Sequence, residues 1–310
     1  MDPTFLHTVL LPTAVGVIML GLALALTPAD FARVVRFPRA VVVGLLVQTI
    51  VLVVVAFAIV QLFDLPPMLA VGFMLLAASP GGAMASLFSH LAHGDVALNI
   101  TLTAINSVLA LAWLPLVMNW SLVHFLGTEL HVPAPTRKLM EVATVIILPV
   151  LIGMSVRHAW PAPALRTAGT VRITSVLLLA IVVAIALATS GETLLQYFGT
   201  VGLACITLNL VSLAIGYAIP RVLGLPVAQA TSISLEIGIH NAAVAIFVAM
   251  KVLESEAASM PAALYGIIML ATAGIAIALA IVFSVLIARP IRQLDQAIRQ
   301  MGTADFTHAV

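Results

Sequence analysis

Long apolar stretches alternate with short clusters of charged residues along the whole chain. Each stretch is long enough to form a helix of about 20 residues, which is the length needed to cross a lipid bilayer. The pattern therefore predicts an all-α polytopic membrane protein with nine spans. The predicted spans cover approximately residues 6–27, 39–62, 66–92, 96–124, 139–157, 171–191, 196–219, 226–250 and 262–288.

The composition supports this interpretation and excludes several classes of protein. Of the 310 residues, 63% are hydrophobic and only 8% are charged, and the mean hydropathy is +1.22. Soluble domains carry about 25% charged residues, so the chain has no room for a separate water-soluble catalytic domain. The net charge of +1 gives no bulk attraction to nucleic acid. The single cysteine, Cys205, excludes an internal disulfide and a cysteine-cluster metal site.

The basic residues indicate an orientation. If successive connections alternate sides, ten of the 13 lysines and arginines fall on one side. The positive-inside rule then places the N-terminus outside and the C-terminus in the cytoplasm, with the protein in the inner (plasma) membrane of the cell. No basic residue precedes the first stretch, so we expect a retained span rather than a cleaved signal peptide.

Two of the nine spans contain interruptions. Ser79-Pro80-Gly81-Gly82 breaks the third span, and Glu236-Ile237-Gly238-Ile239-His240-Asn241 breaks the eighth. The third span begins with Leu65-Pro66 and the eighth with Leu225-Pro226, so adding 160 to each residue number of the first pair gives the second. Because equivalent elements would be five spans apart, this shift predicts an inverted-topology repeat with two discontinuous helices, an arrangement typical of secondary transporters. A chance coincidence of the two Leu-Pro pairs is the alternative.

Buried charge gives the clearest indication of function. Glu236 lies deep in a span, where an ionised carboxylate costs at least about 2.5 kcal/mol. No lysine or arginine falls in the middle of a span, so its partner is a bound cation, a proton or a set of hydrogen-bond donors. Gln48, Ser86, Asn99 and Thr103 supply further polar oxygens within apolar stretches, and such oxygens suit an alkali cation.

Histidines add further candidates. His240 follows Glu236 by four residues and lies within the second interruption. It could carry a proton, form structural hydrogen bonds or act as a ligand donor, and these three interpretations stay open. His90 and His93 have the spacing of metal ligands, but they lie near a loop that adds only Asp95, so we expect a solvated pair.

Other chemistries lack their motifs. The chain has no nucleotide-binding phosphate loop, no H-E-x-x-H zinc-protease motif, no G-x-S-x-G motif and no aspartate inside a span. We therefore predict that the protein is not an enzyme. A channel is also disfavoured, because no filter-like repeat is present and an inverted repeat suits alternating access better.

The two interruptions carry a family resemblance. The segment 79–87, continued by Leu91-Ala92-His93-Gly94-Asp95-Val96-Ala97-Leu98, and the segment 236–241 resemble the crossing helices of the bile acid:sodium symporter family. The resemblance covers about residues 10–288. It implies one transporter unit over residues 1–288, in which a core domain (39–124 and 196–288) moves against a panel domain (6–27 and 139–191) and substrate binds between them.

The resemblance also implies one or two sodium sites. One site would use Ser86, Asn99, Thr103 and Glu236. The other would use Gln48, Glu236, the backbone carbonyls of Ile237 and Ile239, and the side chain of His240. Ala85, Asn99 and His240 depart from the family pattern, and His240 offers a nitrogen where sodium prefers an oxygen. We therefore expect the site at His240 to be the altered one.

The interruptions also suggest where an anion would bind. Half-helices that begin at the breaks point the positive ends of their dipoles at the midplane. We therefore expect the substrate to be an organic anion, bile-acid-like or a small carboxylate, that contacts the breaks. The expected substrate residues are Pro80, Gly81, Gly82, His240 and Asn241. Arsenite transport is disfavoured, because the cysteine that related carriers use does not match Cys205.

The predicted function is therefore a sodium-coupled symporter of an organic anion, with sodium ions, the anion and the lipid bilayer as partners and no nucleic acid. A proton-coupled carrier using His240 is one alternative. The C-terminal residues 289–310 supply another, because Arg289-Pro290-Ile291-Arg292 and Gly302-Thr303-Ala304-Asp305 resemble the start of a HAMP linker of membrane sensors. The simpler interpretation of this tail is an amphipathic basic cap on the last span.

Overall fold

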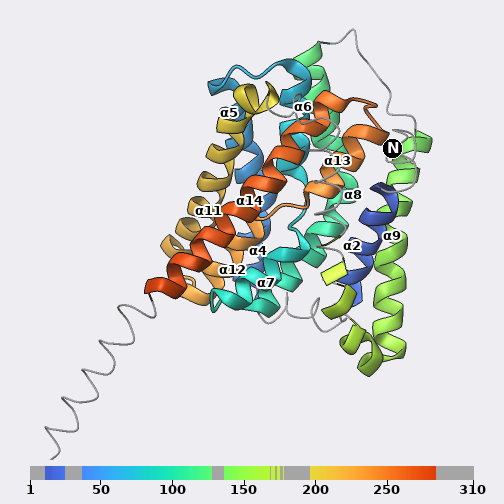
Figure 1. Cartoon of the computed structure of the whole chain (residues 1–310), viewed down its shortest axis with the longest axis vertical. Helices are drawn as coiled ribbons and strands as arrows, with labels where there is room; N and C mark the ends of the chain where they lie inside the picture. Colours follow the sequence, from blue (N-terminus) through green and yellow to red (C-terminus); the bar gives the residue numbers. More distant parts are fainter. Residues whose placement is uncertain are drawn as a thin grey trace, which may run out of the picture. The chain divides into compact units, whose positions relative to one another are not determined.

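The computed structural model describes residues 11–24, 37–127, 136–167 and 196–283, together with six residues between 169 and 177. Every named element in these ranges is a helix, which confirms the predicted all-α class (Figure 1). The main elements are α2 (Leu11–Leu24), α4 (Pro38–Leu46), η2 (Val47–Val51), α5 (Leu52–Leu62), α6 (Pro67–Ala78), α7 (Ala83–Leu91), α8 (Val96–Leu126), α9 (Thr136–Ala159), η4 (Phe198–Gly202), α11 (Leu203–Val222), α12 (Val227–Gly238), α13 (Ala242–Lys251) and α14 (Glu256–Phe283).

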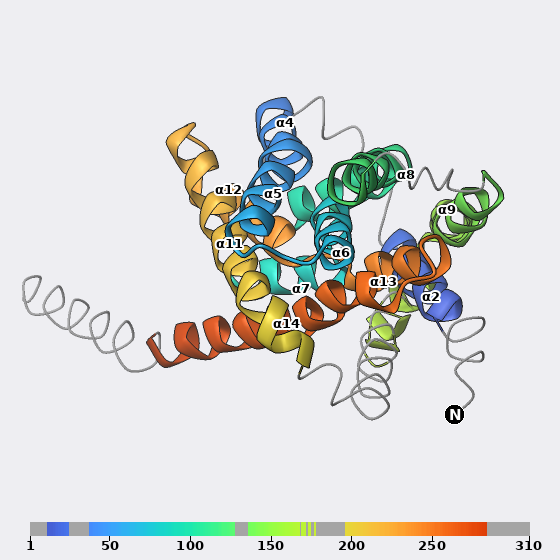
Figure 2. The same ribbon diagram turned by 90° about the horizontal axis from the view of Figure 1, so that it is seen from above.

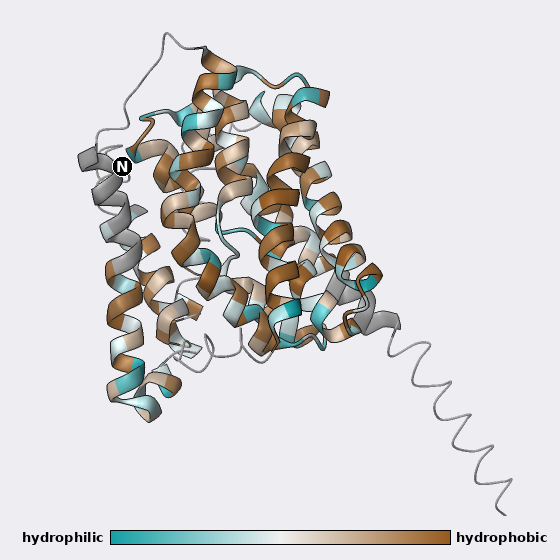
Figure 3. Ribbon diagram, turned by 180° about the vertical axis from the view of Figure 1, so that it is seen from behind, coloured by the Kyte–Doolittle hydropathy of each residue, from teal (hydrophilic) through white to brown (hydrophobic). Residues whose placement is uncertain are grey.

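Several of these helices have the length and composition of membrane spans. Among the described residues, four continuous helical stretches are long and apolar enough to cross a bilayer. They are Pro38–Leu62, Val96–Leu126, Phe198–Val222 and Glu256–Ile275. The ribbon is coloured as hydrophobic along much of the helices, and hydrophilic residues are most frequent near helix ends (Figure 3). These features support a polytopic membrane protein, and the number of nine spans stays a prediction because the sixth falls largely outside the described residues.

Both predicted interruptions are present in the structure. At the first interruption, α6 ends at Ala78, Ser79 is extended with φ −70° and ψ 148°, and α7 begins at Ala83. At the second interruption, α12 ends at Gly238 and α13 begins at Ala242. Pro80 has no backbone N–H to donate, so the helix cannot continue through it with its hydrogen bonds intact.

The two interruptions meet and pair with each other. Gly81 and His240 form an isolated antiparallel β-bridge. The N–H of Gly82 donates to the carbonyl of Ile239 at 2.6 Å, and the N–H of Asn241 donates to the carbonyl of Pro80 at 2.9 Å. This pairing satisfies backbone groups that a helix would otherwise satisfy, as a break inside an apolar protein requires. We call the segments 79–82 and 239–241 the crossing.

Helix bounds recur at the predicted shift in residue number. Pro38–Leu62 and Phe198–Val222 are both 25 residues long, and α6 and α12 are both 12 residues long. Adding 160 to the number of the first residue of α6 gives that of α12, and the same holds for α8 and α14. The turns also correspond, because the N–H of Leu65 donates to Val60 and that of Leu225 donates to Pro220. The opposite orientation of the two copies in a membrane stays a prediction.

The helices α2 and α9 form a pair beside the helices that surround the crossing. α2 packs along α9, and this pair touches α13, α7 and α8. α12 packs on α11, α7 and α8, and α5 packs on α6 and α11 (Figure 2). α2 and α9 are the two described helices assigned to the predicted panel. The core and panel division stays a prediction, because the third panel span, 171–191, is largely outside the described residues.

The chain divides into two compact units, 1–269 and 270–310. The described part of the second unit is the C-terminal portion of α14, which ends at Phe283. The tail 289–310, with its HAMP-like residues, lies outside the described residues.

Candidate functional site

Glu236 lies in the last turn of α12, immediately before the crossing, and only 1% of it is exposed. The Thr103 hydroxyl of α8 lies 2.6 Å from its Oε2 atom, whereas Oε1 has no hydrogen-bond partner among the described residues. Gly81 lies directly against the same carboxylate. A Cβ atom at this position would lie only 2.1 Å from Oε1. The amide of Asn106 also lies beside it. All three neighbours are uncharged, so the carboxylate has no counter-charge among them.

One face of α8 points at α12. The Nδ2 of Asn99 donates to the carbonyl of Ser232 at 3.1 Å, and its Oδ1 has no hydrogen-bond partner. The hydroxyl of Thr103 lies 3.0 Å from the carbonyl of Asn99 as well as near Glu236. A hydroxyl has one proton, so it donates to only one of these two acceptors at a time. Thr103 can therefore donate to an ionised Glu236, or accept from a protonated one while it donates to Asn99.

Gln48 reaches the crossing from the π-helical segment η2. It is 3% exposed, and its Nε2 donates to the carbonyl of Ser79 at 3.0 Å. Its Oε1 has no hydrogen-bond partner. Ser86 is buried on α7, one turn after the crossing. The structure thus places predicted cation ligands on four separate elements, η2, α7, α8 and α12, and their role as ligands stays a proposal.

His240 is fully buried in the crossing. Its ring lies 5.3 Å from the ring of Tyr265, centroid to centroid, and neither ring nitrogen has a hydrogen-bond partner. The neighbouring carbonyl of Ile239 accepts the hydrogen bond from Gly82, and Ile237 is buried on α12. His90 and His93 are exposed, as expected of a solvated pair.

The sequence analysis did not single out three polar residues that support this region. Asn209 of α11 and Tyr265 of α14 both donate to the carbonyl of Gly238, at 3.0 and 2.9 Å, and so cap the broken end of α12. Asn106 follows Thr103 by three residues on α8, so helical spacing could have identified it. No local signal identifies Asn209 or Tyr265, because they reach Gly238 only through the tertiary fold.

Unpartnered polar atoms concentrate around the crossing. Within the described residues, ten buried side-chain nitrogen and oxygen atoms have no hydrogen-bond partner. Eight of them belong to six residues of this region: Gln48, Asn99, Asn106, Glu236, His240 and Asn241. Since buried polar groups are normally satisfied, such a concentration is typical of a site that binds a polar ligand. Four of the eight are oxygens that can coordinate a cation: Gln48 Oε1, Asn99 Oδ1, Asn106 Oδ1 and Glu236 Oε1.

The crossing also brings two helix N-termini together. α7 begins directly after Gly82, and α13 begins directly after Asn241, whose side chain accepts from the N–H of Val244 at 3.3 Å. Each helix presents the positive end of its dipole at the crossing. The predicted substrate residues Pro80, Gly81 and Gly82 therefore pair with His240 and Asn241 at a position that favours negative charge.

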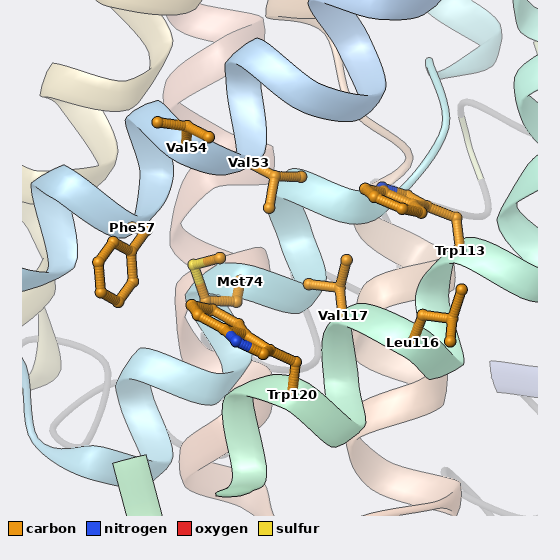
Figure 4. A pocket seen from close by; sticks show the side chains of 8 residues that line it. All are labelled: Val53, Val54, Phe57, Met74, Trp113, Leu116, Val117 and Trp120. Carbon is orange, nitrogen blue, oxygen red and sulfur yellow. The ribbon is translucent and has the colours of Figure 1, made fainter. Parts of the chain in front are cut away.

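A separate pocket of about 380 Å³ lies between α5, α6 and α8 (Figure 4). Its lining residues are Val53, Val54, Phe57, Met74, Trp113, Leu116, Val117 and Trp120. None of them belongs to the candidate cation or substrate residues. Because the lining is almost entirely apolar, this pocket does not offer the polar contacts that bind an ion.

Comparison with known proteins gives a consistent picture. Residues 12–197 match the family model described as the Sodium Bile acid symporter family. The chain is 28% identical over 253 residues to a probable sodium/metabolite cotransporter of chloroplasts from Arabidopsis thaliana, covering 81% of this chain and 62% of the relative. It is 26% identical over 226 residues to an uncharacterized sodium-dependent transporter from Bacillus subtilis, covering 73% and 69%.

A third relative is named as a carrier of anions. The chain is 24% identical over 243 residues to a sodium-dependent organic anion transporter from Bos taurus, covering 76% of this chain and 62% of the relative. The chain spans less than two thirds of the length of the Arabidopsis and Bos taurus relatives.

Proposed function

Because the chain belongs to the sodium bile acid symporter family, we propose that it is a sodium-coupled symporter that carries an organic anion across a membrane by alternating access. The observation that carries this proposal is the buried carboxylate of Glu236 at the crossing. It has one unpartnered oxygen, uncharged neighbours and a surrounding set of unpartnered amide oxygens. A monovalent cation bound there would neutralise the carboxylate and satisfy these oxygens together.

The proposed sodium ligands are those that the family resemblance implies. One ion would bind Ser86, Asn99, Thr103 and Glu236, on α7, α8 and α12. A second would bind Gln48, Glu236, the carbonyls of Ile237 and Ile239, and His240. In this second site the carbonyl of Ile239 already accepts a hydrogen bond, and His240 contributes nitrogen in place of oxygen. We therefore propose that this second site binds sodium more weakly than the first.

The proposed cargo is a carboxylate or another organic anion. The N-termini of α7 and α13 meet at the crossing and favour negative charge without an arginine. The names of the relatives mention metabolites in one case and organic anions in another, which supports this class of cargo. This class of cargo includes both a bile-acid-like anion and a small carboxylate.

The test compares thermal stability of the detergent-purified chain as sodium replaces choline at constant ionic strength. A ligand that binds only the folded state stabilises it by about 2.7 kcal/mol at a hundredfold excess over Kd. We expect a saturable, sodium-specific rise in Tm for the wild type. We expect no such rise for Glu236→Gln, which removes the charge and keeps the shape of the side chain.

The matched control is Glu256→Gln, the same change at an exposed position in the first turn of α14. It should keep the sodium response of the wild type. If the wild type does not respond to sodium at all, the proposal is wrong. A response of Tm to pH alone would then favour the proton-coupled alternative. A positive result would be followed by sodium-driven uptake of carboxylates into proteoliposomes.

A further inference from the structure

Asn106 is a buried polar residue beside Glu236 that has no assigned role. It lies in the middle of α8, and only 4% of it is exposed. Neither its Oδ1 nor its Nδ2 has a hydrogen-bond partner in the described residues. An amide that is buried with both polar atoms unsatisfied is destabilising, so such a residue needs a function that compensates for its burial.

Its position on α8 aligns it with two predicted ligands. Asn99, Thr103 and Asn106 are at positions i, i+4 and i+7, which places them on one face of the helix. The first two already contact α12, through the carbonyl of Ser232 and the carboxylate of Glu236. Asn106 is the next residue along this face, and its amide approaches the same carboxylate without meeting hydrogen-bond geometry in the described part of the chain.

The chemistry of the amide matches the unpartnered atom of Glu236. The Thr103 hydroxyl donates a hydrogen bond to Oε2 of Glu236, and Oε1 has no hydrogen-bond partner among the described residues. A hydrogen bond from Asn106 Nδ2 to Oε1 would satisfy the nitrogen but leave Asn106 Oδ1 unpaired. A cation between Oδ1 and Oε1 would satisfy both oxygens and neutralise the carboxylate, and of these atoms only Nδ2 would keep no partner among the described residues.

We propose that Asn106 is a direct ligand of the transported cation through Oδ1, in a site that it shares with Glu236 and Thr103. This inference rests on the proposed sodium-coupled function and adds a residue to its cation site. The row Asn99, Thr103 and Asn106 would then line one side of the site with two amide oxygens and one hydroxyl oxygen, and Glu236 would face them from α12.

The experiment measures the half-saturating sodium and lithium concentrations for thermal stabilisation of the purified full chain. Asn106→Leu removes both polar atoms at similar volume. Asn106→Asp keeps an oxygen at the same position, removes the donor and adds an ionisable carboxyl group. We expect Asn106→Leu to raise the half-saturating sodium concentration at least tenfold. We expect Asn106→Asp to keep a saturable sodium response but to change the lithium-to-sodium ratio at least threefold, since it replaces a ligand atom.

Asn119→Leu and Asn119→Asp are the matched controls, because Asn119 is an exposed asparagine on the same helix. They should match the wild type in both measurements. An unchanged half-saturating concentration in Asn106→Leu would overturn the inference. So would equal loss of the response in both Asn106 variants, because keeping an oxygen at this position would then make no difference.

If Asn106→Leu does not fold, the lithium-to-sodium ratio of Asn106→Asp decides, and an unchanged ratio overturns the inference. Absence of a sodium response in the wild type would instead overturn the proposed function and this inference with it. A normal wild-type response with unaffected Asn106 variants would overturn this inference alone.

Discussion

His240 is the residue at which the proposed cation site differs most from the family pattern. Its ring is fully buried between the crossing and Tyr265, and neither nitrogen is hydrogen-bonded. The family resemblance implies glutamine at this position, and its amide oxygen is a better sodium ligand than an imidazole nitrogen. The site formed with Gln48 should therefore bind sodium more weakly than one that has an oxygen at position 240.

The substitution His240→Gln tests this difference. It supplies one additional oxygen ligand, and a single such polar interaction is worth about 1 kcal/mol. We expect the half-saturating sodium concentration to fall roughly threefold to tenfold, as measured by thermal stabilisation and by sodium-driven uptake. His90→Gln, at an exposed position on α7, should leave both measurements unchanged. A His240→Gln protein with wild-type sodium dependence would show that this side chain is not a ligand.

At the scale of secondary-structure elements, the crossing depends on close backbone approach. The backbones of the segments 79–82 and 239–241 pair directly, and Glu236 packs against Gly81 with no room for a side chain. The sequence predicted both interruptions, the first from a proline and paired glycines that act locally on a helix and the second from the charged and polar residues that it places inside a span. It did not predict that Gly81 would form one wall of the carboxylate site, which results from contact between segments far apart in the chain.

Gly81→Ala tests the importance of this close approach. Its Cβ atom would lie 2.1 Å from Oε1 and 2.3 Å from Cδ of Glu236, so the carboxylate must leave the position in which it now contacts Thr103. Overpacking of this kind costs about 1–3 kcal/mol. We expect a lower Tm in choline and loss of the sodium-specific rise.

Gly199→Ala makes the same change at a helical position where the added Cβ meets nothing within 4 Å. It should keep both the Tm and the sodium response. Normal sodium stabilisation of Gly81→Ala would show that the carboxylate tolerates displacement, and the proposed geometry of the site would be wrong.

At the scale of the whole molecule, the family assignment agrees with the prediction, and the family is one of transporters rather than enzymes. The recurrence of helix bounds at one constant shift in residue number supports two structurally related halves. If the halves have opposite orientation, equivalent helix ends should lie on opposite sides of the membrane. We propose that the protein is a plasma-membrane carrier with the N-terminus outside.

Leu62 and Val222 provide a matched pair for this test. They end equivalent helical stretches, they are related by the same shift in residue number, and they are 77% and 86% exposed. On a Cys205→Ser background, we expect a membrane-impermeant maleimide to label Leu62→Cys in intact cells. It should label Val222→Cys only after the membrane is permeabilised. Labelling of both from the same side would exclude the inverted orientation.

The sequence alone determined the features that depend on a single residue or on its neighbours along the chain. Apolar length predicts the spans, a proline with two glycines interrupts one of them, polar residues interrupt another, and the desolvation of a carboxylate marks Glu236. Only the tertiary structure decided which polar atoms meet. Thr103 and Glu236 are distant in the sequence and meet because the broken helix α12 packs on α8. The tertiary structure likewise decided which groups lie beside Asn209, Tyr265 and Asn106. Contacts between distant segments follow from helix packing and not from local sequence.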